Sequence, residues 1–258
     1  MQIIKILSPG ERIKIIRKKL GINQEELAGS KFSKNYISMF ENNKRKINPI
    51  NATYLADRIN YLSKEKGEDI YINASYLLKT ESDMATDECN KLFEEVELNN
   101  KINTEEKLGK IYSAIEISKK YNLANYYGRG LYLLGKLSLN NKRYHCAITQ
   151  FLDALDHFSR LNQVSSVVQT HKMLGITMLL RDDIDNALIH FNLAKSNILK
   201  LDKNKINHDI NEEIAYYKSL CYFDNNDVIK AQEILNKIDS SNEKILLLKN
   251  RVKENLVI

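Results

Sequence analysis

Two blocks of the 258-residue sequence repeat each other at a spacing of forty residues. Six positions align without gaps, and five of them are identical. These positions are Leu131, Leu134, Gly135, Ala147, Phe151 and Ala154 in the first block, and His171, Leu174, Gly175, Ala187, Phe191 and Ala194 in the second. Spacings of three and four residues between apolar positions are typical of helices. A repeat of this length predicts helical units that stack side by side and share one core.

The repeated pattern resembles the tetratricopeptide repeat, in which Leu-Gly lets the first helix of a pair approach the second closely. A third, looser copy carries Ser219 in place of the glycine, on a first helix over Ala215–Tyr222. Its second helix would contain Ala231, Leu235 and Ile238. The period of forty residues exceeds the usual thirty-four. It therefore implies longer helices or longer loops.

The ends of the repeat region are less regular. A degenerate first pair would place its first helix over residues 84–98 and its second helix around Ile111 and Ala114. At the other end, Glu243 to Leu256 begins a further helix before the sequence stops. That helix is either a cap or the first half of a repeat whose continuation lies beyond Ile258.

A different pattern occupies residues 12–59, where two short helices are predicted around a tight turn. Asn23 and Ser33 are good N-caps, because their side chains can accept from the free backbone N–H groups of a helix start. In the second of these helices Ile37 and Phe40 are three residues apart and share a buried face. The opposite edge, from Lys34 to Met39, is short, polar and rich in donors, as a DNA major groove requires.

Residues 10–63 resemble the helix-turn-helix of the phage-repressor class, the Cro/CI-like or XRE-family regulators. The matching residues are Arg17, Leu20-Gly21, Gln24 to Ala28, Ser33, Tyr36 to Ser38, Glu41-Asn42 and Lys44-Arg45. There are two departures. The turn between Ala28 and Ser33 is one residue shorter than the common form, and Asn43 replaces a glycine after the recognition helix. Asparagine tolerates the left-handed backbone that a helix end needs, so the second departure is mild.

The resemblance implies a DNA-binding surface centred on the recognition helix. The residues that it assigns to DNA are Gln24, Ser33, Lys34, Asn35, Tyr36, Ser38, Met39, Asn42, Lys44 and Arg45. It also implies a structural ion pair between Arg17 and Glu41. An alternative is that Arg17 is another cation that faces DNA phosphates.

The composition suits an all-helical protein, with two prolines, nine glycines and no tryptophan. We therefore predict an all-α fold, in which a five-helix helix-turn-helix domain precedes a solenoid of the tetratricopeptide-repeat type. The predicted boundaries are 1–66 for the first domain, 67–83 for a linker with a hinge helix starting near Ile72, and 84–258 for the degenerate repeats.

Positive charge is concentrated in the first quarter of the chain. Residues 1–64 carry 13 Lys and Arg against 5 Asp and Glu, a balance of +8, whereas the whole chain has +6, which leaves −2 for the rest. A basic small domain attached to a nearly neutral larger one is the electrostatic layout of a DNA reader. The alternative is a basic surface that serves only solubility.

A helix-turn-helix of this class followed by tetratricopeptide repeats resembles the peptide-pheromone quorum-sensing regulators of Gram-positive bacteria, the group named after Rap, Rgg, NprR, PlcR and PrgX. The resemblance implies a cytoplasmic, dimeric transcription factor that binds double-stranded DNA and senses a short signalling peptide. The first helices of the repeats would line a concave peptide-binding face. Its predicted residues are Arg129, Tyr132, Lys136, Gln169, Lys172 and Tyr216. The alternative is a repeat scaffold that binds a response regulator or an antirepressor, with DNA binding secondary.

No catalytic constellation, cofactor motif or metal site is predicted. The three cysteines, Cys89, Cys146 and Cys221, are far apart and form no CxxC pair, and the five histidines lack metal-ligand spacing. The apolar start Met1–Leu7 is too short for a signal-peptide core, and no apolar run approaches the length of a membrane span. We therefore expect a non-enzymatic protein without membrane contact.

Overall fold

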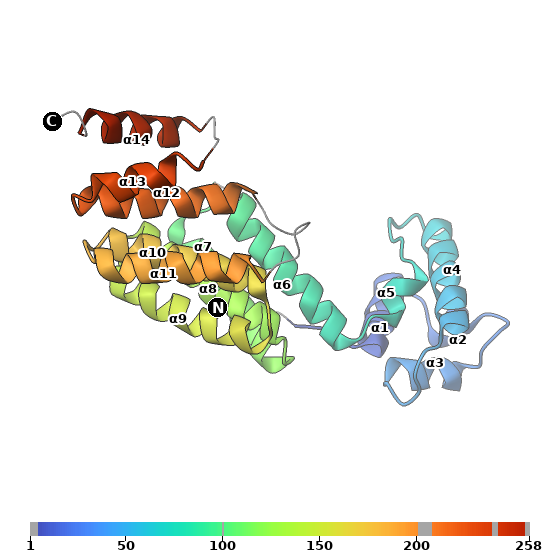
Figure 1. Cartoon of the computed structure of the whole chain (residues 1–258). Coiled ribbons are helices and arrows are strands. Elements are labelled where there is room, and N and C mark those ends of the chain that lie inside the picture. Colours follow the sequence, from blue (N-terminus) through green and yellow to red (C-terminus); the bar gives the residue numbers. More distant parts are fainter. Residues whose placement is uncertain (1–4, 100, 201–207, 239–241, 256–258) are drawn as a thin grey trace. The chain divides into compact units, whose positions relative to one another are not determined.

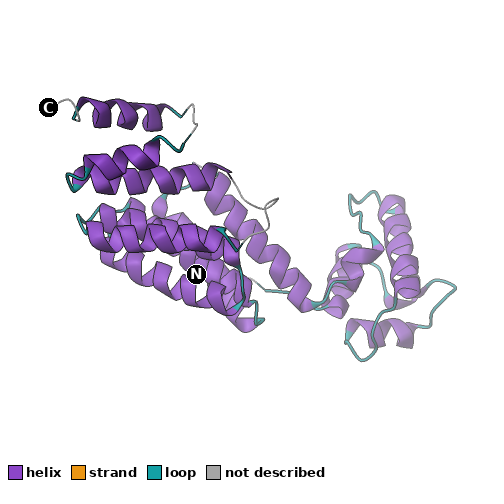
Figure 2. Ribbon diagram, viewed as in Figure 1, coloured by secondary structure: helices purple, strands orange, loops and turns teal. Residues whose placement is uncertain are grey.

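The computed structural model describes residues 5–99, 101–200, 208–238 and 242–255. Within these ranges the regular structure is helical throughout, with helices α1 to α14 and no strand (Figure 2). The predicted all-α fold is thus confirmed. The chain divides into two compact units, one made of Met1–Leu98 with Glu116–Leu123 and the other of Asn99–Ile115 with Ala124–Ile258.

The first unit begins with five helices that enclose one apolar core (Figure 1). They are α1 (Pro9–Lys19), α2 (Gln24–Ala28), α3 (Lys34–Glu41), α4 (Pro49–Glu65) and α5 (Ala74–Leu78). The predicted inward positions Ile37 and Phe40 are fully buried, and so are Ile13 and Leu27. Leu77 of α5 is buried in the same cluster. The fifth helix therefore completes this core, although it lies in the segment predicted to be a linker.

The helices of the first unit begin where polar side chains can cap them. Asn23 accepts from the backbone N–H of Glu26 at 2.9 Å, and the Glu26 carboxylate accepts from the backbone of Asn23 at 2.7 Å. This reciprocal capping box satisfies two backbone donors that a helix start leaves free. Asn73 caps α5 by accepting from the backbone N–H of Tyr76 at 2.9 Å, which moves the start of the helix from the predicted Ile72 to Ala74.

The segment after α5 differs from the prediction of a hinge reaching residue 83. Helix α6 (Glu81–Leu98) already begins at Glu81. Thr80 and Asp83 form the reciprocal bonds of a capping box, with the Thr80 N–H 2.8 Å from Asp83 Oδ2 and the Asp83 N–H 3.1 Å from Thr80 Oγ1. Glu81 and Asp83 also place negative charge in the first turn, where the helix dipole favours it.

Arg12 is a fully buried cation that the sequence analysis did not single out. Its exposed fraction is 1%, and its guanidinium donates to the backbone carbonyls of Leu7 (2.8 Å), Tyr76 (2.9 Å) and Lys79. The guanidinium carbon also lies 5.2 Å from the centre of the Tyr76 ring. Arg12 therefore binds the end of α5 to α1 by satisfying carbonyls that the helix itself leaves free.

The second unit consists of helical pairs (Figure 1). Its helices are the first part of α7 (Thr104–Lys120), then α8 (Ala124–Asn140), α9 (Tyr144–Arg160), α10 (Val164–Leu179), α11 (Ile184–Ile198), α12 (His208–Asp224), α13 (Val228–Leu235) and α14 (Glu243–Glu254). Consecutive helices pack as pairs: α8 on α9, α10 on α11 and α12 on α13. This packing confirms the predicted helical repeat.

Helix ends recur every twenty residues and explain the period of forty. Asn122, Lys142, Asn162 and Asp182 all have φ between 53° and 60°. The residue after each of them donates its backbone N–H to the carbonyl five positions before that donor. An example is the bond from Arg143 N to Ser138 O at 2.8 Å. This is the Schellman motif, which ends a helix at a left-handed residue. Helices of about 17 residues with three-residue turns, rather than long loops, therefore lengthen the repeat.

The repeat glycines lie where two helices touch. A β-carbon on Gly135 would lie 2.5 Å from Cε1 of Phe151, and one on Gly175 would lie 2.6 Å from Cε1 of Phe191. Both phenylalanines are fully buried and cannot move aside freely. Glycine is therefore required by the close approach of the paired helices, as the pattern predicted.

We expect Gly135→Ala to destabilise the second unit by about 1–3 kcal/mol through overpacking against Phe151. Gly109→Ala is the matched control, because Gly109 also lies within a helix but a β-carbon there would meet nothing within 4 Å. This change is expected to stabilise by about 0.5–1 kcal/mol through helix propensity alone. Thermal unfolding of both variants checks the prediction, and a shift of the same sign for both would contradict it.

The third pair, α12 and α13, corresponds to the copy that departs from the repeat pattern in sequence. Ser219 is fully buried at the position of the missing glycine, and its hydroxyl donates to the carbonyl of Ala215 at 2.8 Å. Ala231 and Leu235 lie on α13, whereas Ile238 lies beyond its end and not on the helix as predicted. Helix α14 ends at Glu254, and the predicted end at Leu256 lies outside the described residues.

Candidate DNA-binding surface

Helices α2 and α3 are joined by a turn that is held against α4. Gly29 ends α2 with φ of 58°, a backbone conformation that favours glycine. The Tyr54 hydroxyl donates to the carbonyl of Ala28 at 2.9 Å, and a β-carbon on Gly29 would lie 2.4 Å from that hydroxyl oxygen. The turn therefore packs tightly against α4 and fixes the angle between the two helices.

Helix α3 has one buried edge and one exposed edge. Ile37 and Phe40 have no exposed surface, whereas Lys34, Asn35 and Met39 are exposed on the other side. Ser33 caps the helix by accepting from the backbone N–H of Tyr36 at 3.3 Å. Cap and core together hold the exposed edge in one orientation.

The end of α3 is tied to the start of α1 through Asn43. Its backbone has φ of 55°, so asparagine occupies the left-handed position expected of a glycine. Its side chain does more, because Oδ1 accepts from the backbone N–H of Gly10 at 3.0 Å and Nδ2 donates to the Ser8 hydroxyl at 2.8 Å. Glycine could not supply these bonds. The departure from the family pattern thus links two helices.

A buried carboxylate lies beneath the exposed edge of α3. Glu41 is 3% exposed and accepts two hydrogen bonds from the Arg17 guanidinium, one of them Nη2 to Oε2 at 3.0 Å. Gln24 Nε2 donates to the same carboxylate at 2.8 Å. Burial alone would raise the pKa of Glu41, but the bonds from Arg17 and Gln24 outweigh it and hold that pKa below its usual value. This network joins α1, α2 and α3.

Tyr36 belongs to an aromatic cluster between α3 and α4. Its ring stacks on Phe32 with centroids 5.2 Å apart, and it meets Phe40 edge-on. The Arg45 guanidinium carbon lies 4.3 Å from the centre of the Tyr36 ring, which is cation–π distance. The exposed Arg45 is therefore held beside the start of α3 by the ring.

One comparison with known protein families agrees with this geometry. Residues 13–63 match the family model described as Helix-turn-helix. These residues form a helix-turn-helix domain. No curated protein matches the sequence.

Two solved structures align over most of the chain. A crystal structure of Bacillus thuringiensis PlcR in complex with a peptide and DNA is 12% identical, and the match covers 97% of this chain and 97% of that chain with a TM-score of 0.40. A structure of a PrgX mutant is 13% identical, and that match covers 97% of this chain and 90% of the other with a TM-score of 0.34.

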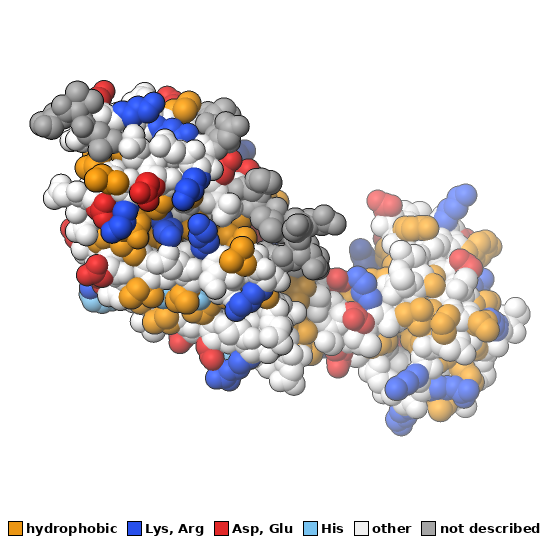
Figure 3. Space-filling model, viewed as in Figure 1, with side chains coloured by type: hydrophobic (Ala, Val, Ile, Leu, Met, Phe, Trp, Pro, Cys, Tyr) orange, Lys and Arg blue, Asp and Glu red, His pale blue; other side chains and the backbone are white. Residues whose placement is uncertain are grey.

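The predicted DNA-binding residues fall into two groups within the helix-turn-helix domain. Seven are exposed, namely Ser33, Lys34, Asn35, Met39, Asn42, Lys44 and Arg45, and Lys34 lies 4.0 Å from the carboxylate of Glu25. Gln24, Tyr36 and Ser38 are half-buried. Several of the ten also have bonds or ring contacts within the protein. Gln24 bonds to Glu41, Ser33 caps α3, Tyr36 lies in the aromatic cluster, and Asn42 donates to the carbonyl of the half-buried Ser38 at 2.8 Å. On the face drawn in Figure 3, Lys and Arg side chains gather over α3.

The residues predicted to bind a peptide come from successive repeats in the second unit. The Lys172 ammonium forms an ion pair with Glu213, which links α10 to α12. Lys136 lies 6.0 Å from the centre of the Tyr132 ring, and that ring also contacts Phe151 at 5.6 Å. Tyr216 meets Tyr217 edge-on at 5.1 Å. Arg129 and Gln169 are half-buried. A peptide carboxylate at Lys172 would therefore compete with Glu213.

Metal clusters and membrane-spanning helices are both absent from the described residues. No group of three or more His, Cys, Asp or Glu side chains is arranged to hold a metal ion there. No helix in the described ranges is long and apolar enough to cross a membrane.

Proposed function

We propose that this protein is a DNA-binding regulator of transcription, in which the exposed edge of α3 reads bases in the major groove. The observation that carries the proposal is the arrangement of Lys34, Asn35 and Met39 on that edge, above a fully buried core. Lysine donates to guanine, and asparagine pairs bidentately with adenine. The charge balance of +8 over residues 1–64 supplies the attraction to phosphates.

We expect Asn35→Ala to relax sequence preference without affecting the fold, since the side chain is exposed. A lost asparagine–adenine pair is worth about 1–3 kcal/mol of discrimination against the wrong base. Selection of bound DNA from a random pool, with wild type and variant, measures the change. Asn141→Ala, an exposed asparagine in the second unit, is the control. Unchanged specificity in Asn35→Ala would remove this residue from base readout.

Lys44 and Arg45 are proposed to contact phosphates, because both are exposed just after α3. Loss of one such contact should weaken binding to specific and random DNA alike and lower the slope of log K against log salt by about 1. Binding of Lys44→Ala and Arg45→Ala is measured over a salt series, with Lys244→Ala on α14 as control. A salt slope equal to that of wild type in both variants would contradict the proposal.

We further propose that the protein acts as a homodimer in the cytoplasm. One helix-turn-helix contacts only a few base pairs, so two are needed, on half-sites about one helical turn apart or a multiple of it. Sedimentation on and off DNA tests the stoichiometry. A monomer at micromolar concentration in both states would contradict it.

We propose a short peptide as the ligand of the second unit, bound across the first helices of the repeats. The support is chemical, since Lys136 and Lys172 supply cations and Tyr132 and Tyr216 supply apolar walls. A peptide can change DNA binding only if it binds one conformation better than another. Calorimetric titration with candidate peptides, comparing wild type with a Lys136→Ala/Lys172→Ala variant, tests the site. No heat from any short peptide would favour the alternative, a scaffold for a protein partner.

A further inference from the structure

A cavity of about 380 Å³ lies between α11, α12 and α13 in the second unit. Its described lining comes from all three helices and from the residues just after α13. These lining residues are Lys195, Asn211, Glu212, Ile214, Ala215, Lys218, Ile234, Lys237 and Ile238. None of them is among the residues predicted to bind a peptide. The size falls in the range of about 300–1,000 Å³ that is usual for small-molecule sites.

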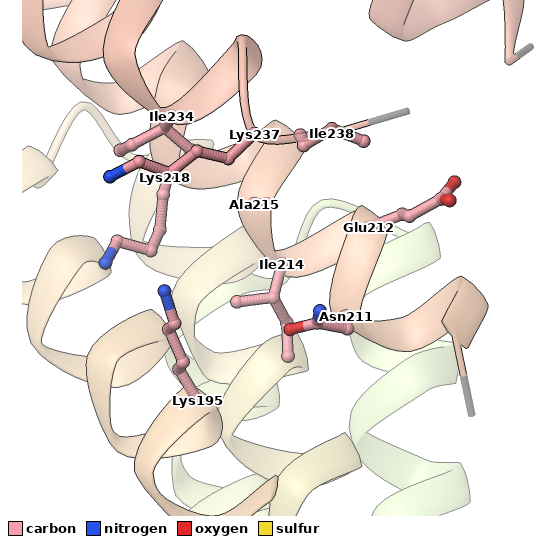
Figure 4. A pocket seen from close by; sticks show the side chains of 9 residues that line it. All are labelled: Lys195, Asn211, Glu212, Ile214, Ala215, Lys218, Ile234, Lys237 and Ile238. Atoms are coloured by element: carbon pink, nitrogen blue, oxygen red, sulfur yellow. The ribbon is translucent and has the colours of Figure 1, made fainter. Parts of the chain in front are cut away.

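Three lysines give this cavity its charge. Lys195 comes from α11, Lys218 from α12 and Lys237 from the residues after α13, and their ammonium groups point toward the same side of the cavity (Figure 4). Glu212 lines the cavity as well, but its carboxylate points the opposite way (Figure 4). Among the described residues, no carboxylate forms an ion pair with any of the three lysines.

Lys218 is the most constrained of the three cations. It is half-buried, and its ammonium donates to Asn192 Oδ1 on α11 at 2.6 Å. Burial lowers the pKa of Lys218, and the positive charge of Lys195 lowers it further. The two ammonium groups therefore repel each other, and an anion between them would relieve that repulsion.

Apart from Asn211, the rest of the wall is apolar. Ile214 and Ile238 are buried, and Ala215 and Ile234 are partly buried beside them. Apolar walls with a few convergent polar groups are the usual composition of a small-molecule site. The cavity therefore offers both an anion-binding side and a surface for the apolar part of a ligand.

We propose that this cavity binds a small phosphate-bearing ligand. Three convergent lysines carry more positive charge than one carboxylate would neutralise. A phosphate group has several charged oxygens, and each of them can accept from a different lysine. The size of the cavity favours a small molecule over a segment of nucleic acid. This inference is independent of DNA reading by α3 and of peptide binding to the repeats.

Inorganic pyrophosphate is the probe, titrated calorimetrically into the full chain at constant ionic strength. The test variant is Lys195→Gln/Lys237→Gln, because both side chains are exposed and their loss leaves the buried packing intact. The matched control is Lys244→Gln/Lys253→Gln on α14, which removes the same charge from exposed positions outside the cavity. We expect saturable binding by wild type, a loss of affinity of about tenfold or more in the test variant, and a change below about twofold in the control.

Two outcomes would overturn the proposal. One is the absence of saturable pyrophosphate binding by wild type. The other is an equal loss of affinity in the test and control variants. It would mean that the affinity for pyrophosphate depends on the net charge of the protein and not on this cavity. Circular dichroism and thermal unfolding of the test variant are measured alongside and are expected to match those of wild type. Lys218→Gln serves as an independent single change in the same cavity.

Discussion

Replacing Arg12 with leucine is expected to destabilise the first unit by about 3–5 kcal/mol, the cost typical of removing one partner of a buried charged group. The guanidinium is 1% exposed and bonds to carbonyls of Leu7, Tyr76 and Lys79. Leucine fills part of the space but donates nothing. Each buried carbonyl left without a donor costs about 1–3 kcal/mol.

The bonds made by Arg12 also predict which part of the first unit loses stability first when Arg12 is replaced. Helix α5 has only five residues, too few to be stable without tertiary contacts. We therefore expect amide hydrogen exchange to accelerate in residues 74–79 before it does in α3 or α4. Thermal unfolding gives the size of the effect, and exchange followed by peptide analysis gives its place.

Arg58→Leu is the matched control for this prediction. Arg58 is a half-exposed arginine that also donates to a backbone carbonyl, that of Glu26, at 3.0 and 3.1 Å. Water can replace its bonds, so the expected cost is about 1 kcal/mol or less. Equal losses of stability in the two variants would show that the buried position of Arg12 does not make its hydrogen bonds more stabilising than those of Arg58.

Sequence reasoning predicted the parts of this protein that depend on local signals. Asn23 and Ser33 cap helices through bonds to residues three positions ahead, so a short stretch of sequence contains the whole interaction. The glycine and phenylalanine of each repeat are likewise separated by a constant spacing. The spacing predicts their contact, and the structure places Gly135 against Phe151.

Contacts between distant residues were not predictable in the same way. Arg12 is one of many basic residues in the first unit, and its carbonyl partners at the end of α5 lie 64 to 67 residues away. The side-chain bonds of Asn43 reach back 33 and 35 residues. The lysines of the cavity come from two helices and from the residues after a third, and they share no periodic pattern. Only the regular spacing of Asn122, Asn162 and Asp182, forty residues and then twenty, was a signal that sequence reasoning could have used.

The ion pair beneath α3 was implied by resemblance rather than derived, and the structure adds Gln24 to it. Gln24 is one of the residues predicted to bind DNA, and its amide also donates to the Glu41 carboxylate. The network thereby connects the surface proposed to bind DNA with the packing of α1. A change in this network is expected to alter both stability and DNA binding.

Arg17→Met is therefore expected to cost about 3–5 kcal/mol, because it leaves the carboxylate of Glu41 buried with only Gln24 as a donor. The double variant Arg17→Met/Glu41→Leu removes both charges and should recover much of that loss. Chemical unfolding of the two single variants and the double variant gives the coupling free energy between the two side chains. If the losses of unfolding free energy in the two single variants add up to the loss in the double variant, the two side chains are not coupled. Arg17 would then be better described as a surface cation.

The same pair predicts the response to acid. Because the pKa of Glu41 is lowered in the folded state, its stabilising contribution is fully present above the unfolded carboxyl pKa, about 4.3. That contribution is lost as pH falls from there through the lower folded pKa. We expect the first unit of wild type to lose stability over this window more steeply than Glu41→Gln, which has no charge to lose at that site. Hydrogen exchange of α1 and α3 between pH 5 and pH 3, after correction for the intrinsic rate, measures both slopes. Parallel slopes would mean that Glu41 is already neutral in the folded protein, and that the hydrogen bonds from Arg17 and Gln24 do not hold its charge.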